Sequence, residues 1–232
     1  MHDELRDRVV AARRQHIPRP CFVEFAGTPK SGKSTCIETV GHFFRRNDYK
    51  VLAPTEGASK RTPYYLKEDL VSFNVWSACY ALTHILEGVH GSDQFQIAFL
   101  DRGLFDALAW FEFLGAEGDI DAAQREAIQQ FLLMDKWRSV IDAVFLFRAD
   151  PETSLKREYE GKLIRDPGRA MNPEFLEKLN QAYAVAQEKF AHHFSNFFAI
   201  DTGKEANSTP QSTAAEVVDK IIGVLENAEG KQ

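Results

Sequence analysis

The clearest chemical feature of the sequence is a phosphate-binding loop. Residues 27–34 read GTPKSGKS and match the pattern G-x-x-x-x-G-K-[ST] in full. Its glycines let the backbone wrap closely around a phosphate, so that successive N–H groups point at the anion. Lys33 has the length to reach the β- and γ-phosphates of a nucleotide, and the Ser34 hydroxyl is a ligand for Mg²⁺. The loop predicts ATP and Mg²⁺ as cofactors. The residues predicted to bind them are Gly27, Thr28, Pro29, Lys30, Ser31, Gly32, Lys33, Ser34 and Thr35.

The residues on both sides of the loop favour the same interpretation. The apolar run CFVEFA, 21–26, is suited to a buried strand, and a helical pattern begins near Lys33. A strand, a glycine-containing turn and a helix are the context that this chemistry requires. A chance match to the short pattern is therefore the weaker interpretation.

An acidic residue and an arginine follow a second apolar run. Asp101 and Arg102 come at the end of QIAFLD, 96–101, which predicts a strand. At the carboxyl end of a strand beside the loop strand, Asp101 is placed to bind Mg²⁺, and Arg102 to bind an acceptor or a phosphate. A surface ion pair at a strand end is the alternative.

Another candidate region follows KVLAP, 50–54, which also predicts a strand. Glu56 could accept a proton from an acceptor hydroxyl or orient it, and a solvated loop glutamate is the alternative. Lys60 and Arg61 could bind an acidic acceptor or belong to an ordinary solvated surface.

The bulk properties exclude several classes of protein. The 232 residues carry a formal net charge of −6, which argues against a nucleic-acid or acidic membrane partner. Three cysteines lack metal-ligand spacing and indicate reduced thiols. No apolar run approaches the length of a membrane span, and the first residues lack the hydrophobic segment of a signal peptide. We therefore expect a cytoplasmic enzyme.

The remaining pattern predicts strands that alternate with helices. Five apolar runs predict strands, at 21–26, 50–54, 96–101, 142–147 and 197–200. Besides the helices that follow the phosphate loop and Arg102, helical patterns lie at 65–87, 121–136, 151–160, 173–193 and 213–226. This alternation predicts a parallel sheet covered on both faces. We expect a helical leader, 1–20, one domain, 21–227, and a tail, 228–232.

These motifs resemble those of the thymidylate kinase and deoxynucleoside kinase group of P-loop kinases. FVEFAGTPKSGKST, FLDRGLFDALAWFEF and the segment from Phe145 to Tyr183 carry the resemblance most strongly, and it extends over most of 21–227. It implies the P-loop NTPase fold, a three-layer αβα architecture with a five-stranded parallel sheet in order 2-3-1-4-5 and a helical lid. It also implies a homodimer, formed through the long helices after the second and third strands.

The resemblance gives roles to individual residues. Glu56 takes the place of the acidic residue near the acceptor hydroxyl, and Asp101-Arg102 that of the acid-arginine motif. The lid, about 155–172, contains the basic residues Arg157, Lys162, Arg165 and Arg169. Arg157 and Arg165 are the stronger candidates for a catalytic role, with Lys33, Glu56 and Arg102. Closing arginines would stabilise charge and exclude water during phosphoryl transfer.

The acceptor side departs from the thymidylate kinase pattern. The helix after the second strand reads SFNVWSACYALTHIL and has no arginine to hold an acceptor phosphate. An aromatic, hydrogen-bonding wall for a base could be formed by Phe73, Asn74, Trp76 and Tyr80, although aromatic residues at helical spacing are also typical of a core. With Glu56, Arg61 and Arg102, the three aromatic residues make up the predicted substrate-binding set.

Three functions are consistent with these residues. The first is ATP-dependent phosphoryl transfer to a small acceptor, a nucleoside or a nucleoside monophosphate. The second is a P-loop ATPase or switch that acts with a protein partner. The third is a kinase for a non-nucleoside hydroxyl, because one scaffold serves many acceptors. The basic lid favours a kinase.

Overall fold

In a computed structural model, the described residues are 2–13, 19–53, 61–90, 94–160, 171–203 and 209–227. Five parallel strands form one sheet in the order β2-β3-β1-β4-β5, as the family resemblance predicted. The strands are β1 (Cys21–Gly27), β2 (Val51–Leu52), β3 (Ile97–Asp101), β4 (Ile141–Arg148) and β5 (Phe197–Asp201).

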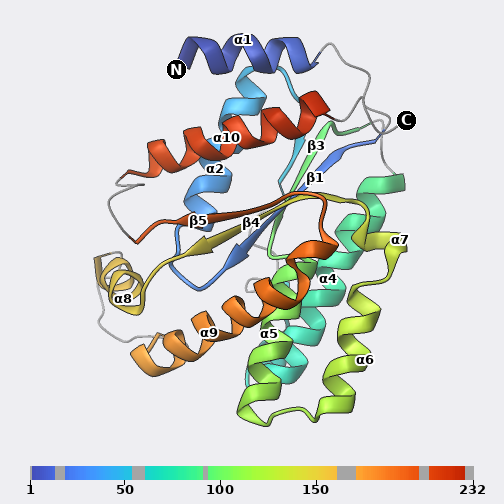
Figure 1. The fold of residues 1–232 in the computed structure, drawn as a ribbon, viewed down its shortest axis with the longest axis vertical. Helices are drawn as coiled ribbons and strands as arrows, with labels where there is room; N and C mark the ends of the chain where they lie inside the picture. Colours follow the sequence, from blue (N-terminus) through green and yellow to red (C-terminus); the bar gives the residue numbers. More distant parts are fainter. Residues whose placement is uncertain are drawn as a thin grey trace.

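Helices cover both faces of this sheet (Figure 1). One face is covered by α2 (Lys33–Arg46) and α10 (Pro210–Glu226), and α1 (His2–Arg13) packs on the outer side of α10. The other is covered by α4 (Leu70–His90), α5 (Leu104–Glu117) and α9 (Pro173–Phe190), with α6 (Ala122–Leu132) and α7 (Asp135–Arg138) outside them. Helix α8 (Pro151–Glu160) follows β4, and short 3-10 turns lie at Tyr64–Leu66 and Ala191–His193.

Strand β1 is the middle strand of the sheet and lies between the two hydrophobic cores. All seven of its residues are buried. Phe22 and Ala26 belong to the core on the α5 side, while Val23 and Phe25 belong to the core on the α2 side. Burial on both faces is the reason the parallel strands appear as apolar runs in the sequence. Glu24 is the charged exception within this buried strand, and it contributes to the candidate site.

Several predicted boundaries were wrong. The helix predicted over 65–87 begins at Leu70, because Asp69 accepts hydrogen bonds from the Val71 and Ser72 N–H groups and so starts it there. The helix predicted over 121–136 is two helices, because Met134 has an extended backbone (φ −56°, ψ 131°) between them. Among the described residues of the strand predicted over 50–54, which are 50–53, the strand pairing is at Val51–Leu52.

Two further ends of helices also moved. The helix predicted to end at 193 is α-helical to Phe190 and continues as the 3-10 turn. The last helix begins at Pro210, three residues before the predicted start. Thr209 and Ser212 form a capping box there, and Pro210 occupies the first helical position.

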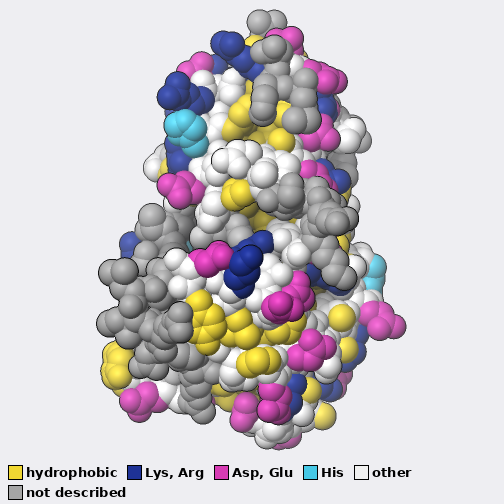
Figure 2. Space-filling model, turned by 90° about the vertical axis from the view of Figure 1, so that its left-hand side faces the viewer, with side chains coloured by type: hydrophobic (Ala, Val, Ile, Leu, Met, Phe, Trp, Pro, Cys, Tyr) yellow, Lys and Arg dark blue, Asp and Glu magenta, His cyan; other side chains and the backbone are white. Residues whose placement is uncertain are grey.

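The surface of the described residues mixes charges of both signs. On the side where α8 lies, basic and acidic side chains are interspersed with hydrophobic ones (Figure 2). Within the described ranges, no helix combines the length and the apolar character that crossing a membrane requires.

Candidate active site

The phosphate loop joins β1 to α2 in a conformation that its glycines require. Gly27 has φ +136°, and a Cβ there would lie 2.2 Å from the carbonyl oxygen of Phe147 on the neighbouring strand β4. Gly32 has φ +95° and is the N-cap of α2. Other residue types rarely adopt these φ values, so the two glycines of the motif are required by backbone geometry. The loop then leads into a helix N-terminus, where the dipole favours an anion.

The Lys33 side chain lies inside this loop. Its ammonium donates to the carbonyl oxygens of Gly27 at 2.6 Å and Thr28 at 2.7 Å, and to Ser31 Oγ at 3.3 Å. The residue is only 6% exposed. The amine is therefore held where the loop would receive a phosphate, and a phosphate is a stronger partner than neutral oxygens.

The surroundings of Lys33 oppose its positive charge. Burial, and then the charge of Arg102, lower its pKa to about 7, although Asp106 and Asp101 act in the other direction. A bound polyphosphate supplies negative charge at this position. We therefore expect it to raise the pKa of Lys33 again.

Ser34 and Asp101 meet although 67 residues separate them. The Ser34 hydroxyl in the first turn of α2 donates to Asp101 Oδ2 at 3.2 Å. The contact forms because β3 pairs with β1, and their carboxyl ends lie at the same edge of the sheet. A hydroxyl and a carboxylate at this edge are oxygen ligands of the kind that Mg²⁺ prefers.

Arg102 is held in an unusual conformation at the same edge. Its φ is +67°, a left-handed value that is rare outside glycine. Its backbone N–H donates to the Phe25 carbonyl oxygen, and its guanidinium donates to Asp106 Oδ2 at 2.9 Å. The guanidinium also lies 5.8 Å from the Trp110 ring centroid, in cation–π range. With 29% of its side chain exposed, Arg102 can still reach a ligand.

Glu24 is a site residue that sequence reasoning missed. Its carboxylate is fully buried and accepts hydrogen bonds from the Gly103, Phe105 and Asp106 N–H groups, at 3.1, 3.1 and 2.7 Å. Burial raises its pKa to about 7, although these N–H groups favour the charged form. A Cβ at Gly103 would lie 2.6 Å from the Glu24 carboxyl carbon, so the contact requires glycine there.

Asp106 was missed as well. It lies in the first turn of α5 and is 2% exposed. Its Oδ1 accepts from the Gly27 N–H at 3.1 Å and from the Tyr183 hydroxyl at 2.5 Å, while Oδ2 accepts from Arg102. The spacing of four from Arg102 gave no helical pairing signal, because Arg102 precedes α5 and has a left-handed backbone.

Arg157 anchors α8 to the phosphate loop. Its guanidinium donates to the Lys30 carbonyl oxygen at 3.1 Å and to the Thr202 carbonyl oxygen at 2.6 Å. The Thr202 hydroxyl donates to the Ser31 carbonyl oxygen, and Lys30 forms an ion pair with Glu158 at 2.9 Å. Arg157 therefore binds the backbone of the phosphate loop and of Thr202, and its catalytic role stays a prediction.

The predicted acceptor residues are only partly described. Glu56, Lys60, Lys162, Arg165 and Arg169 lie outside the described residues. Arg61 is exposed. Phe73, Trp76 and Tyr80 are half-buried on α4, where the Trp76 and Tyr80 rings stack with centroids 5.0 Å apart. Their role in base binding stays a prediction.

Comparison with known proteins identifies the fold. No protein-family model and no curated protein matches the sequence. The fold matches deoxyadenosine kinase from M. mycoides with bound dCTP at a TM-score of 0.58 and 19% identity, over 87% of this chain and 99% of that chain. The same enzyme with bound products dCMP and dCDP matches at a TM-score of 0.59 and 18% identity, over 87% of this chain and 99% of that chain. With bound dATP, the enzyme matches at a TM-score of 0.58 and 18% identity, over 86% of this chain and 98% of that chain. The chain thus has the fold of these deoxyadenosine kinase structures.

Proposed function

We propose that the protein is an ATP- and Mg²⁺-dependent kinase that phosphorylates a nucleoside. The observation that carries this proposal is the meeting of three groups at one edge of the sheet. Lys33 lies in the phosphate loop, the Ser34–Asp101 pair lies beside it, and the Arg102 guanidinium extends from the next loop. Phosphoryl transfer needs positioned cations and a metal more than covalent chemistry, and these residues supply the positions.

The residues present fit a magnesium ion. Ser34 and Asp101 supply a hydroxyl and a carboxylate 3.2 Å apart. Mg²⁺ in nucleotide sites is usually bound by one or two protein oxygens, with substrate phosphates and water as the other ligands. When bound, the ion would neutralise charge on the β- and γ-phosphates. Ser34 and Asp101 are the residues that would hold it.

The chain's own residues have separable roles in this proposal. Lys33 binds the β- and γ-phosphates, and Arg102 binds the acceptor or the phosphoryl group in transfer. Glu56 accepts the proton of the acceptor hydroxyl as the new bond from its oxygen to the γ-phosphorus forms and the bond from that phosphorus to the leaving ADP breaks. Arg157 and Arg165 close over the nucleotide and exclude water.

A nucleoside is the preferred acceptor over a nucleotide for two reasons. Helix α4 has no lysine or arginine along Leu70–His90 to hold an acceptor phosphate, although it carries Phe73, Trp76 and Tyr80, which could stack on a base. The fold also matches enzymes that are deoxyadenosine kinases. A nucleoside monophosphate, as in thymidylate kinases, is the second candidate.

A panel of acceptors tests the proposal. The protein is incubated with ATP and Mg²⁺ and with deoxynucleosides, ribonucleosides, their monophosphates or sugars, and the phosphorylated product is measured. We expect phosphorylation of at least one nucleoside and less ADP when no acceptor is added. Product from sugars alone would support a non-nucleoside acceptor. ADP formation that depends on an added protein and on no small molecule would support the ATPase or switch.

The homodimer that the resemblance implies is also a proposal. Residues 104–114 of α5 are all buried within one chain, so α5 offers little surface to a second copy. Helix α4 exposes Val75 and Leu86, at 39% and 37%. A dimer would therefore depend mainly on α4, and sedimentation velocity would detect it.

A further inference from the structure

The Asp106 carboxylate connects the phosphate loop, the loop that carries Arg102, and helix α9. The proposed reaction needs the two loops at a fixed distance from each other. The carboxylate accepts one hydrogen bond from the phosphate loop, at the Gly27 N–H, and one from the acceptor side, at the Arg102 guanidinium. The third comes from the Tyr183 hydroxyl on α9, which follows the predicted lid in the chain. Gly27 and Tyr183 lie 79 and 77 residues from Asp106 in the sequence.

Asp106 is not an ordinary helix cap. The free N–H groups at the start of α5 donate to Glu24, which accepts from Gly103, Phe105 and Asp106 itself. In the described contacts, the Asp106 carboxylate accepts nothing from its own helix and bonds only to other segments. Glu24 therefore stabilises the helix end, and this leaves the Asp106 carboxylate available to the two loops and α9.

Asp106 is also not placed to act on a substrate directly. Both of its oxygens already accept hydrogen bonds, and the residue is 2% exposed. Burial raises the pKa of Tyr183 well above its usual value, so its hydroxyl remains a protonated donor at neutral pH. A carboxylate surrounded by donors acts through the groups that it holds.

The held groups need this support. Arg102 has a left-handed backbone at φ +67°, which persists only where its surroundings fix it. The Gly27 N–H belongs to the first residue of the phosphate loop, in a turn that tolerates no Cβ. One carboxylate that bonds to both fixes the distance between the phosphate-binding loop and the acceptor-side guanidinium.

We propose that Asp106 is a positioning residue, held by Tyr183, that keeps the phosphate loop and Arg102 in one geometry for phosphoryl transfer. The inference rests on the proposed kinase function. It adds a coupling between the two halves of the site, which neither the phosphate-loop motif nor the acid-arginine pair contains alone.

Asp106→Asn is the most informative variant. An amide oxygen in the place of Oδ1 can still accept from Gly27 and Tyr183, but the NH₂ group then faces the Arg102 guanidinium, donor against donor. We expect kcat to fall about 50-fold while the Kd of a non-hydrolysable ATP analogue changes less than about threefold. Asp106→Ala removes all three contacts, and we expect the ATP analogue to bind about tenfold more weakly.

Two further experiments test whether the loss of kcat in Asp106→Asn comes from the contact with Arg102 or from the loss of any buried carboxylate on α5. Glu112→Gln is the matched control, because Glu112 is a buried carboxylate on the same helix with a contact to α9, and we expect kcat within about twofold of wild type. In an Arg102→Ala background, Asp106→Asn should cost less than about threefold, because its target is gone. A loss that a double-mutant cycle shows to be additive would overturn the inference.

The remaining outcomes are also decisive. If Asp106→Asn does not fold, Tyr183→Phe takes its place: a kcat lowered about fivefold supports the inference and an unchanged kcat overturns it. A wild-type protein that phosphorylates no acceptor contradicts the proposed function instead. In that case the ATP analogue decides the inference, because equal binding to wild type and Asp106→Ala would refute a link from Asp106 to the phosphate loop.

Discussion

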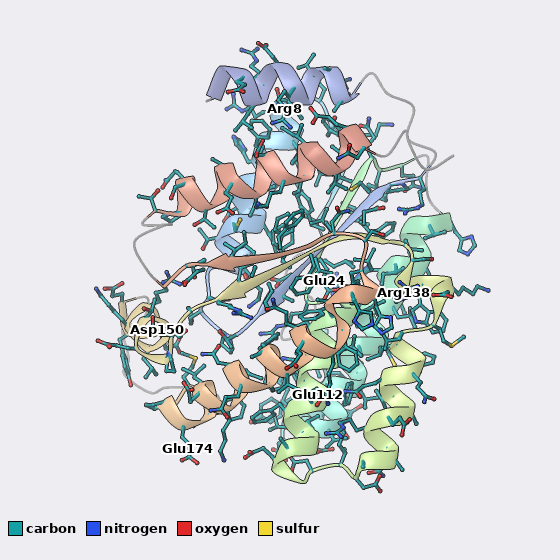
Figure 3. The ribbon with its side chains drawn as sticks, in the orientation of Figure 1. Arg8, Glu24, Glu112, Arg138, Asp150 and Glu174 are labelled. Carbon is teal, nitrogen blue, oxygen red and sulfur yellow. The ribbon has the colours of Figure 1, made fainter. Side chains whose placement is uncertain are left out.

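Helix α5 carries two buried carboxylates that contact different parts of the molecule. Asp106 and Glu112 are 2% and 5% exposed, and both reach α9, through Tyr183 and Lys189. Figure 3 shows Glu24 between the sheet and the helices, near the start of α5, with Glu112 farther along that helix. Asp106 with its partners is the first cluster, and Glu112 with its partners is the second. Both carboxylates lie on α5, contact α9 and are buried to a similar degree.

Their partners differ in kind. Asp106 bonds to loops at the carboxyl ends of β1 and β3, including a backbone N–H of the phosphate loop. Glu112 bonds to side chains of neighbouring helices, with Gln129 at 2.8 Å and Lys189 at 3.0 Å. Loops at the carboxyl ends of parallel strands usually carry function, whereas contacts between helices hold layers together. Changes in the first cluster should lower turnover, and changes in the second should lower stability.

Lys33→Ala should give the largest separation of turnover from stability. Loss of the ammonium removes the cation that the loop offers to the phosphates, and we expect turnover to fall about 1,000-fold. The free energy of unfolding should change by no more than about 1 kcal/mol, because the buried charge is itself unfavourable to the fold. Steady-state kinetics and urea unfolding measure the two quantities.

The control for this variant is Lys178→Ala. Lys178 is a part-exposed lysine on α9 that pairs with Glu117, far from the loop in sequence. We expect it to leave turnover unchanged. If Lys33→Ala retained its activity, the phosphate loop would have no part in the reaction. The contrast between site residues that set turnover and helix contacts that set stability would then be wrong.

The sequence alone predicted the strand, turn and helix around the phosphate loop, and the structure has these elements, whereas the roles of the loop residues stay predictions. The phosphate loop is a local pattern, and Asp101-Arg102 follows a short apolar strand, so neither needed knowledge of distant contacts. The strand order came from the family resemblance, and it places β3 beside β1, which brings Asp101 to Ser34. Features carried by consecutive residues can therefore be placed from the sequence, and their part in a reaction stays a prediction.

The coupling residues could not be found in the same way. Glu24, Asp106 and Tyr183 make contacts between residues 77 to 82 positions apart, and one sequence contains no record of such pairs. Only indirect signals existed: a glutamate inside a strand predicted to be buried on both faces requires buried donors. Helix ends moved for a different reason, because local capping by Asp69 and Thr209 outweighed hydrophobic periodicity.

Glu24→Gln tests whether the buried carboxylate that accepts from the Asp106 N–H responds to pH. Burial raises the pKa of Glu24 from about 4.5 to about 7, so between these values the folded state binds more protons than the unfolded state. The Glu24 contribution to the free energy of unfolding therefore falls as the pH rises from 5 to 8, by up to about 3 kcal/mol.

A glutamine has no such titration. The difference in unfolding free energy between wild type and Glu24→Gln should therefore shift in favour of the variant over that pH range. Urea unfolding at half-unit pH steps measures it, and all other titrating groups cancel in the difference. A difference that stays constant from pH 5 to 8 would contradict a raised pKa at this carboxyl.

Glu112→Ala should give the smallest effect of these variants. It should lower the free energy of unfolding and leave turnover unchanged, the opposite of Lys33→Ala. The Gln129 amide loses its acceptor while it is buried, whereas Lys189, with 47% of its side chain exposed, can turn to water. We expect a loss of about 2 kcal/mol in the free energy of unfolding, as for a buried polar group left without a partner. Turnover at a temperature well below the transition should match wild type, because the cluster contacts neither loop of the site. A fall in kcat comparable to that of Asp106→Asn, with stability preserved, would show that both carboxylates of α5 position the reaction and that the comparison does not hold.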